Sequence, residues 1–134
     1  MRDSIGTLGF CMGGKLSVLT AAANPQTISA AVSFYGGGLA GENLRPGQTN
    51  PMDEVAKVKA PLLLFYGDND MFIKPEHVEK FTGKLKELGK NFESKVYAGA
   101  GHGFFCDERP GHNPDAAKDA WGRVVEFLGK NLKR

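Results

Sequence analysis

Residues 8–14 (Leu-Gly-Phe-Cys-Met-Gly-Gly) constrain this chain more than any other stretch, because they place one thiol between closely spaced glycines. The apolar run Ile5–Phe10 precedes the thiol with the length of a strand, and the Leu-, Val- and Ala-rich residues 15–23 follow with the composition of a helix. Strand, tight turn and helix around Gly-x-Cys-x-Gly are typical of a nucleophile elbow in which Cys replaces Ser. The pattern predicts a strained backbone at Cys11, and it predicts small residues two positions away on each side so that strand and helix can approach.

The side chain of Cys11 is expected to project above a sheet, at the start of a helix. The helix dipole and the unpaired N–H groups there favour a thiolate over a thiol. The backbone N–H of Met12 would point toward a developing oxyanion. A free cysteine is also often no more than a small buried apolar residue. The elbow alone therefore leaves both catalysis and simple packing open.

Composition sets the broad class of the chain. It has 134 residues, 41% hydrophobic and 24% charged, as expected for one soluble globular domain over residues 1–134. The formal net charge of +2 is too small to indicate a nucleic-acid partner. No apolar run approaches the roughly 20 residues that cross a bilayer, and no signal peptide opens the chain, so no membrane partner is expected. Two cysteines, Cys11 and Cys106, do not make a disulfide framework, which predicts a reducing, cytoplasmic setting; a bridge between them is the alternative.

Strands and helices are expected to alternate along the chain. Near-continuous apolar runs predict strands buried on both faces, and one alternating run predicts a less buried edge strand. The strands are expected at residues 6–10, 28–35, 61–66 and 92–97, the last being the edge. The helices are expected at residues 12–23, 75–88 and 114–131. The last helix is expected to bury one face made of Ala117, Trp121, Val124, Val125 and Leu128. This order indicates an α/β fold with roughly four mostly parallel strands and flanking helices.

Residues 36–53 form a long connection rich in Gly, Asn and Pro. Long loops without secondary structure are usually functional or mobile in a compact domain. The loop is interpreted as a rim over an active site, with a plain surface connection as the alternative.

Three side chains with catalytic chemistry follow three predicted strands: Cys11, Asp70 and His102. The carboxyl ends of parallel strands meet at one edge of the sheet, where catalytic groups collect. The chain order of nucleophile, acid and histidine is the order found in α/β-hydrolases. In such a triad Cys11 attacks an acyl carbonyl, His102 accepts its proton, and Asp70 orients His102.

Four motifs then lie in register along the chain. They are Gly9-Phe10-Cys11-Met12-Gly13-Gly14, Tyr35-Gly36, Gly67-Asp68-Asn69-Asp70 and Gly99-Ala100-Gly101-His102-Gly103-Phe104. Together, from about residue 4 to residue 131, they resemble the dienelactone hydrolase family (carboxymethylenebutenolidases), a Cys-dependent branch of the α/β-hydrolase fold. The resemblance implies that Cys11 is the nucleophile, Asp70 rather than Asp68 the acid, and His102 the base. It also implies hydrolysis of small esters or lactones without a metal or organic cofactor.

The chain resembles only the C-terminal half of that family's domain, which predicts a half-size α/β-hydrolase-like fold. Family members usually carry several more strands before the elbow. Those strands supply a second oxyanion donor and, in the type member, a Glu that influences whether the cysteine is ionised. Neither residue is assigned in this chain. The family's type member has an Arg shortly after the His that holds a substrate carboxylate. Cys106 occupies that place here, and Arg109 lies further on. Neutral esters with short acyl chains are therefore favoured over anionic dienelactones.

A half-size sheet would leave the first strand as an unpaired apolar edge, which invites pairing with another chain. We therefore expect a homodimer, in which the partner could complete each site. The rival interpretations are a non-catalytic half-domain or fragment acting as a dimerisation or binding module, and a hydrolase whose best substrate is a thioester or phosphotriester.

Other residues carry weaker signals. Tyr35, Phe104 and Cys106 are candidates for lining the pocket. Tyr35 could equally be packed, Phe104 could be core or pocket wall, and for Cys106 a structural role as a small buried residue is favoured. His77 is interpreted as a surface histidine, and His112 as part of a surface loop, with a place at the rim of the pocket as the alternative. A metal site made of His102, Cys106 and His112 is disfavoured, because no tight ligand spacing supports it.

Overall fold

The computed structural model describes residues 4–106, 108 and 112–132. Four parallel strands form one sheet in the order β1-β2-β3-β4, so each strand pairs with the next one along the chain. The strands are β1 (Ile5–Phe10), β2 (Ile28–Phe34), β3 (Leu62–Gly67) and β4 (Phe92–Tyr97). The helices are α1 (Met12–Ala23), α2 (Pro51–Glu54), a 3-10 turn η1 (Val55–Lys57), α3 (Pro75–Glu87) and α4 (Pro114–Asn131). The predicted α/β class is confirmed, and each predicted strand and helix lies within one residue of its expected bounds.

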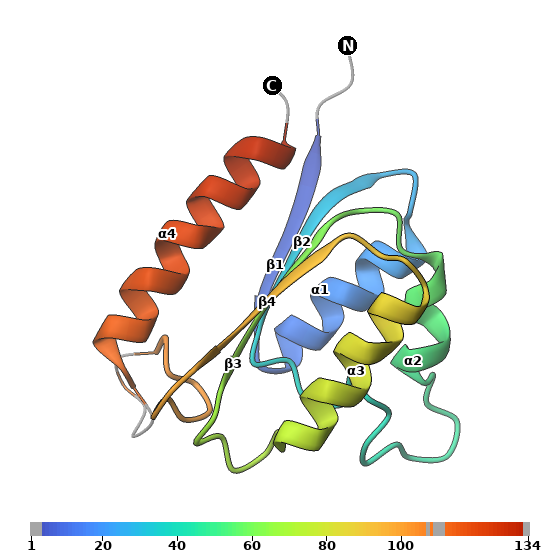
Figure 1. The fold of residues 1–134 in the computed structure, drawn as a ribbon. Coiled ribbons are helices and arrows are strands. Elements are labelled where there is room, and N and C mark those ends of the chain that lie inside the picture. The colour runs from blue at the N-terminus through green and yellow to red at the C-terminus, as the bar shows by residue number, and fades with distance from the viewer. Residues whose placement is uncertain (1–3, 107, 109–111, 133–134) are drawn as a thin grey trace.

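The sheet is the middle of three layers (Figure 1). Helix α4 covers one face, and α1, α2 and α3 cover the other. Strands β2 and β3 lie between these layers and are almost wholly buried, as near-continuous apolar runs predict. Because all four strands run the same way, the residues that follow them gather at one edge of the sheet.

The short helices α2 and η1 were not expected from the sequence. Asn50 caps α2 by accepting a hydrogen bond from the backbone N–H of Met52, and Pro51 occupies the first helical turn. The expected loop of residues 36–53 therefore ends at residue 50. A helix of four residues is too short to produce an apolar period, so only its cap could have indicated it.

Strand β1 is not buried on both faces, and that expectation is wrong. Ile5, Leu8 and Phe10 are 49%, 36% and 38% exposed. The reason is position: β1 ends the sheet and pairs only with β2 among the described residues, which is the apolar edge expected of a half-size sheet. Its apolar sequence is that of an interior strand, whereas its place is that of an edge. Strand β4, at the opposite edge, is mostly exposed as predicted.

Helix α4 buries a different face from the one expected. Its buried residues are Ala116, Ala120, Val124 and Phe127. Trp121 and Val125 are 49% and 56% exposed, so of the expected face only Val124 is fully buried. Both sets recur at helical spacing, and the set with two alanines faces the sheet because small residues let helix and sheet approach closely. Leu128 and Leu132 extend toward β1, where a Cβ on Gly6 would lie 3.3 to 3.4 Å from their methyl groups.

No helix in the described part of the chain is both long and apolar enough to cross a membrane.

Candidate active site

The sharp turn between β1 and α1 holds Cys11 in a strained conformation. Its φ of 59° and ψ of −121° lie in a region that residues with a side chain seldom adopt. Such a conformation costs on the order of 1–3 kcal/mol and persists only where the surroundings enforce it. The N–H of Cys11 donates to the carbonyl of Phe34 at 2.9 Å, which ties the turn to the end of β2. The strain predicted from the elbow motif is therefore confirmed.

Of the three glycines around Cys11, Gly9 and Gly14 leave no room for a side chain, whereas Gly13 does. A Cβ on Gly9 would overlap the carbonyl of Gly13, so the strand could not approach the helix. A Cβ on Gly14 would lie 2.7 Å from the Ser33 hydroxyl and 2.8 Å from the Phe34 carbonyl. A Cβ on Gly13 would meet open space. The requirement for a small residue is therefore confirmed before the cysteine, but after it the requirement falls on Gly14 and not on Gly13.

Cys11, His102 and Asp70 form one continuous hydrogen-bonded chain. His102 Nδ1 donates to Asp70 Oδ2 at 2.7 Å, since a carboxylate can only accept. This bond leaves His102 Nε2 facing Cys11 Sγ at 2.9 Å. The carboxylate side chain is 1% exposed and the imidazole 11%, so water competes little for either group. The arrangement has the connectivity of a nucleophile, a base and an orienting acid.

The turn after β3 places the carboxylate of Asp70, and not that of Asp68, against His102. Asp70 Oδ1 accepts hydrogen bonds from the backbone N–H groups of Phe72 and Ile73, at 2.7 and 3.0 Å, while Oδ2 accepts from His102. Asp68 instead accepts from the N–H of Gly99 at 2.6 Å and so fixes the start of the loop that carries the histidine. The two carboxylates therefore hold neighbouring loops in different ways.

Asp70 also sets the electrostatics of the histidine. Its hydrogen bond is the largest of the influences that raise the pKa of His102 above its ordinary value. Burial opposes that rise, and the hydrogen bond and charge of Cys11 add to it. The protonated imidazole is thus stabilised next to the thiol, which suits a group that accepts a proton from it.

Met12 is the first residue of α1, so its N–H has no acceptor within the helix. This position suits the oxyanion donor expected from the elbow motif, and the adjacent helix dipole has its positive end there. The side chain of Met12 is 74% exposed beside the site.

Two hollows border the Cys11–His102 pair. The first, of about 350 Å³, is lined by Phe10, Cys11, Tyr35, His102, Gly103 and Cys106. The second, of about 300 Å³, is lined by Cys11, Met12, Gly37, Phe72 and His102. Tyr35 and Cys106 therefore border the first hollow. Phe104 does not, because it is 0% exposed and its ring packs 5.2 Å from Tyr35 and 5.4 Å from Tyr97.

Phe10, Gly37 and Phe72 were not expected at the site. Phe72 could have been found, because it lies two residues after Asp70, where an Asp side chain commonly bonds back to the chain and makes a tight turn. Gly37 is the part of the 36–53 connection that borders a hollow, so the expected rim is limited to the start of that segment. Farther along it, Glu42 pairs with His77 at 3.2 Å and ties the segment to α3.

The remaining candidates have structural partners. The ring of His112 bonds to the carbonyl of Phe104 at 2.9 Å, so it helps hold the loop after the candidate base. No group of three His, Cys, Asp or Glu side chains in the described segments is arranged to hold a metal ion. Arg109 lies outside the described residues.

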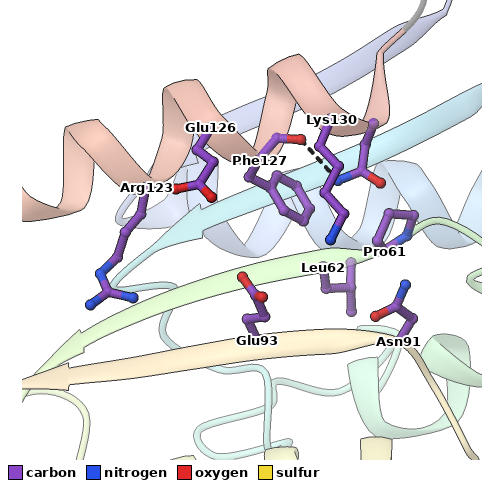
Figure 2. A pocket seen from close by; sticks show the side chains of 9 residues that line it. Pro61, Leu62, Asn91, Glu93, Arg123, Glu126, Phe127 and Lys130 are labelled. Atoms are coloured by element: carbon purple, nitrogen blue, oxygen red, sulfur yellow. Dashed lines mark hydrogen bonds between the residues drawn. The ribbon is translucent and has the colours of Figure 1, made fainter.

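A further pocket lies far from these groups, between α4 and the amino-terminal ends of β3 and β4 (Figure 2). It has a volume of about 190 Å³, and the charged side chains around it are Glu93, Arg123, Glu126 and Lys130. The Cys11–His102 pair lies at the carboxyl ends of the strands, so this polar pocket belongs to the other end of the sheet.

The fold is that of α/β-hydrolases. The chain matches the model of the dienelactone hydrolase family over residues 1–132, and it belongs to that family. This bears out the resemblance carried by the four sequence motifs.

Relatives agree with this assignment. The chain is 39% identical over 122 residues to a Salmonella typhimurium protein named "putative carboxymethylenebutenolidase", covering 91% of this chain and 44% of that protein. It is 35% identical over 130 residues to a Bradyrhizobium protein named "probable 2-oxo-3-(5-oxofuran-2-ylidene)propanoate lactonase", covering 97% and 52%. A solved Klebsiella pneumoniae structure, named as a putative dienelactone hydrolase, superposes with a TM-score of 0.83 at 35% identity over 91% of this chain and 50% of that one. The chain thus spans about half the length of the relatives it matches.

Proposed function

We propose that this chain is a hydrolase that cleaves small carboxylic esters or lactones through Cys11, His102 and Asp70. The observation that carries the proposal is the continuous hydrogen-bonded chain from Sγ through the imidazole to a buried carboxylate, at 2.9 and 2.7 Å. The family relationship supports the substrate class, because its named relatives are carboxymethylenebutenolidases and a lactonase.

The proposed reaction runs through an acyl-enzyme. The sulfur of Cys11 forms a bond to the carbonyl carbon while the thiol proton passes to His102 Nε2, and the Met12 N–H donates to the oxyanion. The tetrahedral intermediate then expels the alcohol oxygen, which takes the proton from His102. Water, deprotonated by His102, next attacks the thioester and releases the acid and the free thiol. Throughout these steps Asp70 holds the imidazole and stabilises its protonated form.

Neutral substrates with short acyl chains fit this proposal best. The described residues that line the two hollows include no Lys, Arg, Asp or Glu side chain. A substrate carboxylate would lose part of its hydration there without gaining a cationic partner among these residues.

We also propose that the chain works as a homodimer. The exposed apolar side chains of β1 are Ile5, Leu8 and Phe10. Trp121 and Val125 on α4 are exposed as well, and Trp121 packs on Phe105, which in turn contacts Phe10. An exposed apolar edge strand is a template for pairing with another chain, and a second copy would cover it by two-fold symmetry. Sedimentation velocity at micromolar concentration tests this: a dimer that Leu8→Lys dissociates is expected, and a wild-type monomer would overturn it. The free thiol at the centre of the site suits a reducing, cytoplasmic setting, which we include in the proposal.

The test of the function is hydrolysis of a short-chain aryl ester by the wild-type chain and by Cys11→Ala. Wild type is expected to turn over, and Cys11→Ala is expected to lose at least about a thousandfold in kcat/KM. Cys106→Ala removes the other free thiol. Because Cys106 borders the first hollow, this variant is expected to lower kcat/KM by at most about tenfold, which still separates loss of the nucleophile from loss of any cysteine. Equal rates for wild type and Cys11→Ala would contradict the proposal. Absence of turnover in both would favour the non-catalytic binding module instead.

A further inference from the structure

Both cysteines of this chain border one hollow. The sequence has two cysteines, Cys11 and Cys106, and each is a free thiol. They lie far apart in the sequence, yet both line the first hollow of about 350 Å³, together with His102. The candidate nucleophile therefore has a second thiol at the wall of its own hollow, and the hydrolysis proposed above uses only one of the two.

The loop after β4 turns back on itself and brings Cys106 to this place. The Cys106 N–H donates to the carbonyl of Gly103 at 2.9 Å, and a turn of this kind holds the Cα atoms of its two ends within about 7 Å. Gly103 directly follows His102, whose Nε2 lies 2.9 Å from Cys11 Sγ. Cys106 is thus one turn away from the imidazole that faces the candidate nucleophile.

The segments that carry the two cysteines also pack against each other. The rings of Phe10 and Phe105, which directly precede the two cysteines, lie 5.3 Å apart between centroids. The backbone of Cys11 is fixed, because its N–H donates to the carbonyl of Phe34 within the strained elbow. Cys106 is exposed. A disulfide needs Cα atoms roughly 4.4–6.8 Å apart, and any adjustment to reach this spacing falls on Cys106 and not on the elbow.

The surroundings of Cys11 favour its reaction with an oxidant. Its thiol faces the His102 imidazole, whose protonated form is stabilised by the buried carboxylate of Asp70, so the thiol can pass its proton to that ring. The thiolate is the form of cysteine that reacts with peroxides. Oxidation is therefore expected to begin at Cys11, where the thiol of Cys106 at the same hollow can meet the oxidised sulfur.

We infer that Cys106 is the resolving cysteine of a reversible oxidation of Cys11 by hydrogen peroxide. The Cys11 sulfur forms a bond to one peroxide oxygen, the O–O bond breaks, and the departing oxygen takes the proton held by His102 and leaves as water. The Cys106 sulfur then bonds to the sulfur of the sulfenic acid, the S–O bond breaks, and the hydroxyl leaves as water with the Cys106 proton. Two thiols and one peroxide thus give one disulfide and two waters, and a dithiol reverses the change by exchange.

The disulfide would switch the nucleophile off and protect it at the same time. A sulfenic acid that meets no second thiol is oxidised further to a sulfinic acid, which dithiols do not reduce. The inference goes beyond the proposed function, because it concerns the two thiols and not the substrate. It also agrees with a reducing setting, in which such a disulfide is transient.

The test is treatment of the reduced full chain with a small molar excess of hydrogen peroxide, followed by mass spectrometry of its peptides under non-reducing conditions. A peptide pair joined between Cys11 and Cys106 is expected, with loss of both free thiols, and dithiothreitol should restore the thiols and ester hydrolysis. In Cys106→Ser the Cys11 sulfur should gain two oxygen atoms, and dithiothreitol should restore about tenfold less of that variant's own starting activity than it does in wild type. Cys11→Ser is the matched control, in which Cys106 should remain a thiol at the same peroxide dose.

Three results would overturn this inference. The first is a wild-type chain in which Cys11 becomes a sulfinic acid while Cys106 is still a thiol. The second is a disulfide that joins two chains, seen as a doubled mass under denaturing, non-reducing conditions. The third is full recovery of Cys106→Ser by dithiothreitol, with circular dichroism as the control for folding.

The inference and the proposed function fail separately. A disulfide between Cys11 and Cys106 in a chain that hydrolyses no ester would support this inference and contradict the proposed function. Ester hydrolysis that depends on Cys11, in a chain that forms no such disulfide, would do the reverse.

Discussion

The two ends of the sheet are built in different ways. At the carboxyl end, Cys11 and Tyr35 follow β1 and β2 with φ values of 59° and 40°, and apolar hollows surround a linked thiol, imidazole and carboxylate. At the amino end, the polar pocket of Figure 2 lies among charged side chains. There Lys90, just before β4, donates to the carbonyls of Ala56 and Val58 at 2.8 Å each.

This difference shows where the fold carries strain and where it does not. Backbone strain of this kind costs stability and is found where a side chain must be held in a particular place. The amino end satisfies its backbone carbonyls with a lysine that takes no part in the candidate site. Substitutions at the carboxyl end should therefore change activity, or stability together with activity, and those at the amino end should change stability alone.

The largest effect is expected from Asp70→Asn. The amide keeps an oxygen that can accept from the Phe72 and Ile73 N–H groups, but it no longer offers a charged acceptor to His102. We expect kcat/KM for a short ester to fall by roughly a thousandfold to ten-thousandfold, as loss of the orienting carboxylate does in comparable triads. Steady-state kinetics measure it, with far-ultraviolet circular dichroism as the control for folding. A loss of less than tenfold would mean that the carboxyl end does not work as a linked triad.

Asp70→Asn should also change the pKa of His102 in a defined direction. The pKa of His102 is raised mainly by the Asp70 hydrogen bond, so removing the carboxylate should lower that pKa, as an NMR titration of the ring would show. Because the pKa of His102 is higher in the folded than in the unfolded protein, protonation of this ring stabilises the folded state. That stabilisation is fully present below the unfolded pKa of about 6.5 and is lost as the pH rises through the folded pKa. The stability difference between wild type and Asp70→Asn should therefore be largest below that value and shrink above the folded pKa. An upward shift of the His102 pKa in the variant would refute this account.

Gly9→Ala should have the next largest effect, and it should lower stability and activity together. Its Cβ would overlap the Gly13 carbonyl, and the backbone of a strand and a helix cannot shift as an exposed side chain can. We expect the free energy of unfolding to fall by about 3 kcal/mol or more, measured by urea denaturation.

Gly13→Ala is the matched control, because a Cβ there meets open space. It lies within α1, where replacing Gly by Ala is expected to stabilise by about 0.5–1 kcal/mol. If both variants behaved alike, close approach of strand and helix would not be what the elbow requires.

A smaller effect should reveal the strain itself. Cys11→Gly and Cys11→Ala both remove the thiol, but only Gly adopts a φ of 59° without steric cost. We expect Cys11→Gly to be the more stable of the two by about 1 kcal/mol, once the greater chain entropy of unfolded Gly is allowed for. At Cys106, whose φ is not positive, the order should reverse. The same order at both positions would show that the turn at Cys11 is not strained.

The sequence predicted the parts of this molecule that depend on local chemistry. The elbow motif predicted the turn at Cys11, and apolar runs bounded by Gly and Pro predicted all four strands. Cys11, Asp70 and His102 each follow a predicted strand, and parallel strands bring their carboxyl ends to one edge of the sheet. The sequence therefore predicted that these three side chains lie close together, as they do.

What the sequence did not predict depends on neighbours. The residues of β1 are those of an interior strand, and only the resemblance to half of a domain indicated that this strand lies at an edge of the sheet. Trp121 and Val124 share a helix with two possible apolar faces, and the choice follows from how closely the helix packs on the sheet. Phe104 and Phe72 are both aromatic residues near the site, and only tertiary packing shows that one is in the core while the other is exposed.

The smallest effect is expected at the amino end, from Lys90→Met. The thioether keeps the apolar stem and removes the two hydrogen bonds to the Ala56 and Val58 carbonyls. The loss of stability should be about 1 kcal/mol, the usual net contribution of such bonds, with ester hydrolysis within twofold of wild type. Lys86→Met on the exposed surface of α3 is the control and should change stability by less than about 0.5 kcal/mol. A loss of activity in Lys90→Met without a matching loss of stability would mean that the amino end communicates with the thiol, and the division between the two ends of the sheet would fail.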